Sequence, residues 1–216
     1  MNNQSKNLVG TLYLARHGET EANSAKIVQG TSDTPLTELG RRQAEALGKR
    51  LQGSGVASIA SSDLPRAVAT AEIVQQFVKA ETVVQWPEVR ERSWGIYDLK
   101  PVELYWKARR DFEEQNPGKE FLPPGGEPLH SVASRVTVVL EKLEKLLPTT
   151  SVLVVGHAAF NREFLRHLLH PGQKNAPRYE QDSACLNVIS FGSGDFRIQV
   201  QRLNCTAHWS GLNLDH

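Results

Sequence analysis

Apolar residues along the chain follow two patterns that predict different secondary structure. Short runs rich in apolar and β-branched residues predict strands at 8–15, 56–60, 82–85, 151–156, 186–191 and 196–203. Longer segments with apolar residues three or four positions apart predict helices at 37–51, 63–79, 102–114, 128–147 and 158–170. Strands that alternate with helices indicate an α/β fold, a three-layer sandwich with a mainly parallel central sheet flanked by helices.

Residues near the ends of these segments predict where the helices begin and end. Thr37 and Asp63 are expected to cap the first two helices, because their side-chain oxygens can accept backbone N–H groups. Pro148 is expected to end the long helix. The polar stretch 19–35 is expected to be a loop with one short turn.

The segment 86–126 lacks a regular pattern and mixes aromatic residues, prolines and charges. One helix is predicted within it, and the run Pro123–Gly126 marks a loop. We expect this segment to be an insertion of helix and loops that lies over the edge of the sheet and over the site. No linker-like stretch divides the chain, so residues 1–216 are expected to form a single domain.

Composition and charge exclude several classes of protein. The chain has 216 residues, a net charge of +1 and no long basic stripe, so nucleic acid is not expected as a partner. No apolar run approaches the roughly 20 residues that span a bilayer, and the N-terminus lacks a signal-peptide core, so no membrane partner is expected. Cys185 and Cys205 are not expected to form a disulfide framework. We therefore expect a cytoplasmic enzyme that is a monomer or a homodimer.

Basic residues occur where predicted strands end and helices begin. His17 follows the first strand directly, together with Arg16, and His157 follows the most apolar strand. Arg66 lies in the first turn of the helix after the second strand. Because ligands bind at the carboxyl ends of strands in open α/β sheets, these four residues are expected to converge. A phosphoryl group is the concentrated negative charge that such a cluster would accommodate.

In such a site His17 would be the nucleophile that accepts the phosphoryl group. Nearby arginines favour the neutral imidazole that attack requires. Phosphoryl transfer depends mostly on positioning and electrostatic stabilisation, which these groups supply without a metal. The leaving group needs a proton, and Glu91 is the leading candidate, because partial burial beside an aromatic residue would favour its protonated form. Glu19 is an alternative, although its place next to His17 suits support of the loop better.

Six segments of the chain carry these residues in a characteristic order. They are Arg16–Thr20 with Asn23, Gly30–Gly40, Ser61–Ala71, Glu91–Gly95, Pro123–Glu127 and Val154–His157. Together they resemble the signature segments of the histidine phosphatase superfamily, in the branch that contains cofactor-dependent phosphoglycerate mutases and many small-molecule phosphatases. Leu203–His208 is similar to the closing strand of that family, so the resemblance spans nearly the whole chain.

The resemblance implies a role for each of these positions. His17 would carry the phosphoryl group, and Glu91 would donate the proton. The groups implied to surround the phosphate are Arg16, Arg66 and His157. The positions implied to contact phosphate or substrate are Asn23, Gln29, Gly30 and Ala158. The resemblance implies a phosphatase that uses no metal and no cofactor and acts on a small phosphorylated metabolite.

The chain departs from the family pattern around the expected substrate mouth. Ala158 stands where the family often has glycine, and Pro128 replaces the usual serine. After Gly95 the chain continues with Ile96–Lys100 in place of a tryptophan-acid-glycine run. These departures concern the identity of the substrate more than the chemistry.

Two alternatives to hydrolysis stay open. A cofactor-dependent phosphoglycerate mutase would use the same phosphohistidine, but dedicated mutases resemble longer chains with an extra arginine-rich insertion and a C-terminal tail. Here the segment 111–124 is short and the chain ends soon after His208, which favours hydrolysis. A non-catalytic phosphate-recognition protein is the lesser alternative, because all five expected catalytic positions are filled.

Other residues carry weaker signals. His167 and His170 have a spacing that can bind a metal, but no third ligand is evident, and an exposed helix end is the preferred interpretation. The aromatic residues between Trp94 and Trp106 are expected to form the core of the insertion, with a pocket wall as the alternative.

Overall fold

Six strands form one central sheet in the order β3-β2-β4-β1-β5-β6. The computed structural model describes residues 8–173, 175–192 and 198–212. The strands are β1 (Leu8–Arg16), β2 (Val56–Ser61), β3 (Val83–Gln85), β4 (Ser151–Gly156), β5 (Leu186–Gly192) and β6 (Ile198–Cys205). Strands β1 to β4 pair in parallel, β5 is antiparallel to β1, and β6 is antiparallel to β5. The sheet is therefore mixed but mainly parallel, as the sequence pattern predicts.

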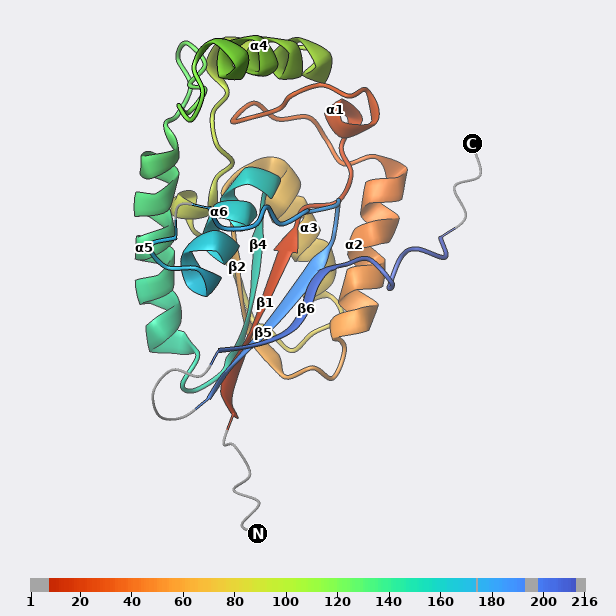
Figure 1. The fold of residues 1–216 in the computed structure, drawn as a ribbon. Coiled ribbons are helices and arrows are strands. Elements are labelled where there is room, and N and C mark those ends of the chain that lie inside the picture. Colours follow the sequence, from red (N-terminus) through yellow and green to blue (C-terminus); the bar gives the residue numbers. More distant parts are fainter. Residues whose placement is uncertain (1–7, 174, 193–197, 213–216) are drawn as a thin grey trace.

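Helices cover both faces of this sheet (Figure 1). They are α1 (Glu21–Ser24), α2 (Glu38–Leu51), α3 (Pro65–Gln75), α4 (Val102–Gln115), α5 (Leu129–Leu146) and α6 (Ala158–Leu169). Two short 3-10 turns at Pro87–Val89 and Gly95–Tyr97 precede α4. Helices α5 and α6 lie on one face and α2 and α3 on the other, which confirms the three-layer α/β architecture.

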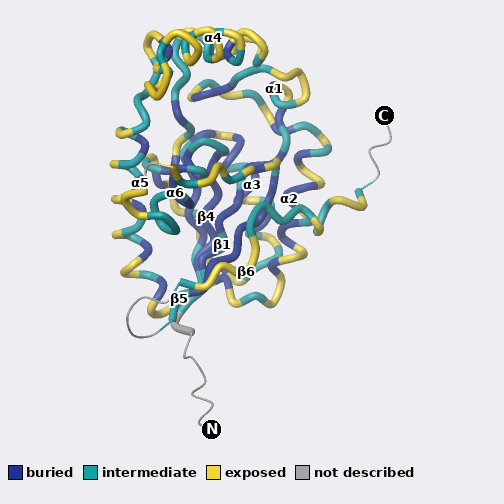
Figure 2. The backbone as a smooth tube through the Cα atoms, viewed as in Figure 1, coloured by how far each residue is buried: buried dark blue, intermediate teal, exposed yellow. Residues whose placement is uncertain are grey.

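The central strands are buried (Figure 2), and their pleat divides the core side chains between the two faces. Leu14 and Val154 are buried against α5 and α6, whereas the following residues, Ala15 and Val155, are buried against α2 and α3. Successive side chains of a strand point to opposite faces, so β1 and β4 must be apolar on both. This explains why the central strands are nearly continuous apolar runs and why polar residues begin only where they end.

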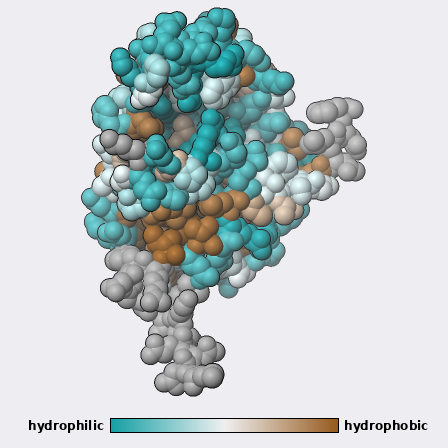
Figure 3. All heavy atoms as spheres, in the orientation of Figure 1, coloured by the Kyte–Doolittle hydropathy of each residue, from teal (hydrophilic) through white to brown (hydrophobic). Residues whose placement is uncertain are grey.

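The insertion at 86–126 lies beyond the carboxyl ends of the parallel strands, with α4 outermost (Figure 1). Tyr105 is buried at its centre and makes edge contacts with Trp94, Tyr97 and Trp106. The prediction of an aromatic core is confirmed for Tyr105, and the alternative of a pocket wall also holds, because Trp94, Tyr105 and Trp106 line cavities. Figure 3 shows mainly hydrophilic side chains over α4. None of the helices among the described residues combines the length and apolar character that a bilayer crossing would need.

Two details at the helix ends differ from the sequence prediction. Thr37 caps α2 by accepting from the Gly40 N–H at 3.0 Å, as predicted. Asp63 does not cap α3: the N-cap is Leu64, and the Asp63 carboxylate instead accepts from Arg90 Nε at 2.6 Å. Pro65 lacks an N–H, so the first turn has one donor fewer to satisfy.

The end of α3 and the start of β6 also differ from the bounds predicted from the sequence. Helix α3 ends at Gln75 instead of 79, because the next residues form tighter bonds to carbonyls three positions back. The predicted last strand began at 196, whereas β6 begins at Ile198, and residues 196 and 197 lie outside the described part of the chain.

Candidate active site

Residues from separate elements meet at the carboxyl edge of the sheet. The His17 N–H donates to the Gly156 carbonyl at 3.0 Å, so the ends of β1 and β4 lie side by side. The residues gathered at this edge enclose a cavity of about 190 Å³. The predicted site residues that line it are Arg16, His17, Asn23, Gln29, Gly30, Arg66, Glu91 and Ala158. Only His157 of the predicted set does not line the cavity; it is fully buried, with its ring centroid 5.1 Å from that of His17.

Hydrogen bonds determine which nitrogen of His17 is free to react. His17 Nδ1 lies 2.7 Å from the Gly18 carbonyl oxygen, which can only accept, so Nδ1 carries the proton. His17 Nε2 lies 3.3 Å from Arg66 Nε, which can only donate, so Nε2 presents a lone pair. The arrangement defines a neutral imidazole whose Nε2 faces the basic cavity, as a nucleophilic histidine requires.

The surroundings of His17 also disfavour its charged form. Burial lowers its pKa well below the ordinary value of 6.5, and Arg16 and Arg66 lower it further. Burial likewise lowers the pKa of His157 well below 6.5, with Arg66, His17 and Arg16 contributing. Both histidines are therefore held neutral, which confirms the expected influence of nearby arginines on His17.

Arg66 connects the loop after α1 to His17. Its side chain is 1 % exposed and donates to the Ser32 carbonyl at 2.7 Å and the Gly30 carbonyl at 2.8 Å. Its Nη1 also lies 2.7 Å from a carboxylate oxygen of Asp33. With all its nitrogens oriented, the Arg66 guanidinium is a rigid positive charge at the edge of the cavity.

Two buried side chains near the Arg66 guanidinium have polar nitrogens without a hydrogen-bond partner. Within the described residues, neither ring nitrogen of His157 has a hydrogen-bond partner, and neither has Arg16 Nε. Arg16 Nη1 donates to the Gln181 carbonyl at 2.9 Å, which holds the side chain in place. Unpartnered buried polar groups are costly and call for an explanation. An anion with several acceptor oxygens would satisfy them.

Glu91 occupies a different environment from the one predicted. Its carboxylate accepts from the Ala159 N–H at 3.0 Å and the Phe160 N–H at 3.2 Å, at the N-terminus of α6, and from the Arg92 N–H at 2.9 Å. The sequence prediction expected partial burial beside an aromatic residue and did not anticipate these backbone donors. Glu91 still lines the cavity, so its position suits proton exchange with a bound group.

The loop residues predicted to contact substrate form hydrogen bonds that hold the loop in its conformation. Asn23 forms a capping box with Thr20 at the start of α1. Gln29 accepts from the Thr20 hydroxyl at 2.9 Å and donates to the Thr34 hydroxyl at 2.8 Å. Gly30 has a φ of +54°, and a Cβ there would lie 2.0 Å from the Asp98 carboxylate, so a larger residue would be strained and would displace Asp98.

The atypical segment Ile96–Lys100 packs against this same loop. The Leu99 N–H donates to the Val28 carbonyl at 2.7 Å, and the Val28 N–H donates to the Lys100 carbonyl at 2.9 Å. Asp98 accepts from the Trp94 N–H at 3.1 Å, and burial raises its pKa from the ordinary value. The segment thus fixes the position of residues 28–30 along the cavity.

Several residues that support the site were not predicted. Asp33 orients Arg66, the Thr70 hydroxyl accepts from the Gly18 N–H at 3.1 Å, and Gln181 holds Arg16. Asp33 lies within the signature segment Gly30–Gly40. An acidic residue in that segment was the available sign that Asp33 pairs with a site arginine. Gln181 lies in an irregular stretch where no sequence signal marks it.

Two histidines outside the site, His170 and His208, have polar partners within the protein. His170 Nε2 lies 2.7 Å from the Tyr179 hydroxyl, and His208 Nε2 lies 3.0 Å from the Ala184 carbonyl oxygen. Burial lowers the pKa of His208 from 6.5. Among residues 8–173, 175–192 and 198–212, no three histidine, cysteine or acidic side chains come together as metal ligands.

Comparison with known proteins identifies the family. The family model of the histidine phosphatase superfamily (branch 1) matches residues 12–205. A Proteus mirabilis protein named probable phosphoglycerate mutase GpmB is 34% identical over 152 residues, which cover 68% of either chain. The chain therefore belongs to the histidine phosphatase superfamily.

Solved structures share the fold. The structure of a mycobacterial glucosyl-3-phosphoglycerate phosphatase in complex with VO3 has a TM-score of 0.73 and 25% sequence identity, covering 90% of this chain and 99% of that chain. Bacillus stearothermophilus YhfR has a TM-score of 0.76 and 27% identity, covering 91% of this chain and 98% of that chain.

Because both site histidines are held neutral, the stability of the fold is expected to depend on pH. The unfolded chain takes up a proton at each histidine near pH 6.5, whereas the folded state does so only at much lower pH. The free energy of unfolding is therefore fully retained above pH 6.5 and falls as the pH drops below it. Each histidine accounts for about 1.4 kcal/mol between pH 7.5 and 5.5.

Chemical denaturation of His157→Gln at the two pH values measures this contribution. The variant should lose about 1.4 kcal/mol less stability between pH 7.5 and 5.5 than the wild type does. His130→Gln, at an exposed position of α5, is the matched control and should keep the wild-type difference. An unchanged pH dependence in His157→Gln would contradict the neutral state of that ring.

The position of Arg66 is expected to depend on Asp33. Asp33→Asn removes the charge that orients the guanidinium but leaves its bonds to two carbonyl groups. A misplaced Arg66 should lower kcat/KM for phosphate-ester hydrolysis about 10- to 100-fold. Asp63→Asn, which breaks an ion pair with the half-exposed Arg90 side chain, is the control and should retain wild-type kinetics. Equal activity in both variants would show that Asp33 has no positioning role.

Proposed function

We propose that this protein is a phosphatase that hydrolyses a small phosphorylated metabolite through a phosphohistidine on His17, without a metal. The observation that carries the proposal is the neutral imidazole of His17, with its proton tied to the Gly18 carbonyl and Nε2 facing Arg66. The relatives support it in part, because one solved neighbour is named as a phosphatase of glucosyl-3-phosphoglycerate.

Binding begins with exchange of hydrogen bonds around the cavity. The phosphoryl oxygens of the substrate take up the free donor of Arg16 and draw Arg66 Nε away from His17 Nε2. A proton on one ring nitrogen of His157 gives a further donor to the phosphoryl group. The arginines neutralise the charge that spreads over the phosphoryl oxygens during transfer.

Transfer then proceeds in two steps. His17 Nε2 forms a bond to phosphorus as the bond to the leaving oxygen breaks, and Glu91 donates a proton to that oxygen. In this scheme Glu91 enters the first step protonated, and the proton that it gives up is replaced in the second step. In the second step Glu91 takes a proton from water, the water oxygen attacks phosphorus, and inorganic phosphate leaves His17 with its lone pair restored.

A phosphoglycerate mutase is the second candidate function. The 34% identity to a protein named probable phosphoglycerate mutase GpmB favours it. The first step would be the same, but the phosphoryl group would return to an organic acceptor instead of water. Incubation with 3-phosphoglycerate and a bisphosphoglycerate primer distinguishes the two: hydrolysis releases inorganic phosphate, whereas a mutase yields 2-phosphoglycerate without it.

Replacement of the nucleophile tests the proposal. His17→Ala should lower the turnover of p-nitrophenyl phosphate at least about a thousandfold, because no other group can form the covalent intermediate. His167→Ala, in the last turn of α6 and outside the cavity, is the matched control and should keep wild-type turnover. The wild-type protein should retain its activity after dialysis against a chelator. Activity that persists in His17→Ala, or that requires a divalent cation, would refute the proposed mechanism.

A further inference from the structure

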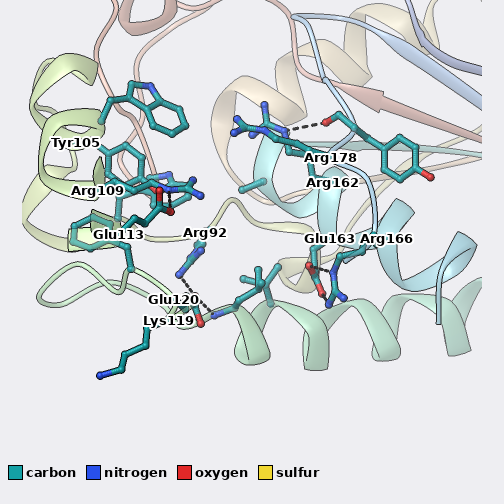
Figure 4. Close-up of a pocket in the computed structure, with 18 of the residues that line it drawn as sticks. Arg92, Tyr105, Arg109, Glu113, Lys119, Glu120, Arg162, Glu163, Arg166 and Arg178 are labelled. Atoms are coloured by element: carbon teal, nitrogen blue, oxygen red, sulfur yellow. Dashed lines mark hydrogen bonds and ion pairs between the residues drawn. The ribbon is translucent and has the colours of Figure 1, made fainter. Parts of the chain in front are cut away.

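Figure 4 shows a second cavity, of about 720 Å³. It adjoins the smaller cavity at His17, which we call the phosphate cavity. The two share Trp94, Tyr105, Trp106, Ala159 and Arg162 in their walls. Figure 4 shows labelled residues of α4 on one side of the larger cavity and of α6 on the other. Its volume lies in the range of about 300–1,000 Å³ typical of sites for small molecules. It is therefore large enough for the part of a substrate that is not transferred.

The charges in the wall of this cavity do not balance. Three carboxylates line it, and each is paired with an arginine that lines it too: Glu113 with Arg109, Glu120 with Arg92, and Glu163 with Arg166. Three basic residues remain, namely Lys119, Arg162 and Arg178. The side chain of Lys119 is exposed, so water screens its charge. The unbalanced charge inside the cavity is therefore that of Arg162 and Arg178.

These two arginines share one distant carboxylate. Arg162 Nη2 and Arg178 Nε each lie 3.7 Å from a carboxylate oxygen of Glu180, whose side chain is 66% exposed. Both distances exceed those of good charge-assisted hydrogen bonds. Burial lowers the pKa of Arg162 from its ordinary value, and the neighbouring Arg178 lowers it further. Two guanidinium groups held close together beside a cavity are stabilised by an anion between them.

Contacts with the backbone and with an aromatic ring hold both guanidinium groups in position. Arg162 Nε donates to the Tyr179 carbonyl at 3.1 Å. The Arg178 guanidinium lies 5.4 Å from the centre of the Trp106 ring, a cation–π contact. Because these contacts use one nitrogen of Arg162 and the face of Arg178, donors on both remain available to an oxyanion.

We propose that the larger cavity binds the leaving group of the substrate, and that Arg162 and Arg178 hold a second anionic group on it. The substrate class is then a phosphomonoester whose organic part bears a carboxylate or a second phosphate. This inference rests on the proposed function, since it assigns the leaving group of that reaction. Arg162 lines both cavities, so the bond that breaks lies between the phosphate cavity and the second anion, beside Glu91.

Binding to the His17→Ala variant, which is not expected to turn substrate over, tests the proposal by calorimetry. The first pair of probes is 6-phosphogluconate and sorbitol 6-phosphate, which differ only by a carboxylate in place of a hydroxymethyl group. The second pair is fructose 1,6-bisphosphate and fructose 6-phosphate, which differ by one phosphate. The compound with the second anion should bind about tenfold more tightly in at least one pair. The pair that shows the preference identifies the anion as carboxylate or phosphate.

Removing one arginine should abolish this preference. Arg178→Gln in the same background should weaken binding of the preferred compound about tenfold and leave binding of its partner, which lacks the second anion, unchanged. Arg110→Gln removes the same charge from an exposed position outside both cavities and should keep the preference. Equal affinities within both pairs, or equal weakening of both partners by Arg178→Gln, would overturn the proposal. If the wild type hydrolyses neither these four compounds nor p-nitrophenyl phosphate but the preference persists, the proposed function fails and the second-anion site stands.

Discussion

The hydrogen-bonded guanidinium of Arg66 is the interaction on which the geometry of the site depends. It links the loop 30–33 to the N-terminus of α3 and reaches His17 at the end of β1. A buried arginine is stable only when its donors are satisfied, so the loop must offer two carbonyl groups and a carboxylate to it. That requirement explains the tight loop conformation, in which Gly30 adopts a positive φ against Asp98.

The same cluster sets the electrostatics of the cavity. Burial, together with Arg16 and Arg66, keeps both histidines neutral, and Arg16 Nε and the ring nitrogens of His157 lack partners among the described residues. An anion with several oxygens would satisfy these donors, whereas a neutral ligand would leave the positive charges unbalanced. In the adjoining cavity, too, positive charge exceeds negative charge, because Arg162 and Arg178 share the single carboxylate of Glu180.

Much of this arrangement could be predicted from the sequence, because the ends of apolar strands mark the edge where ligands bind. The positions of His17, His157 and Arg66 follow from strand ends and a helix start, and the structure brings them together. The surroundings of Glu91 could not be predicted, since its N–H donors come from α6, far away in the chain. The roles of Asp98 and Arg178 depend on the packing of irregular segments, which hydrophobic periodicity does not describe.

The central claim is that His17 is a neutral imidazole with its proton on Nδ1 and a lone pair on Nε2. Nitrogen-15 NMR of the histidine side chains, with His17 assigned by comparison with His17→Ala, observes this state directly. The account predicts the neutral Nδ1–H tautomer in the free protein, unchanged between pH 7.5 and 5.5. An imidazolium within that range, or a proton on Nε2, would contradict it.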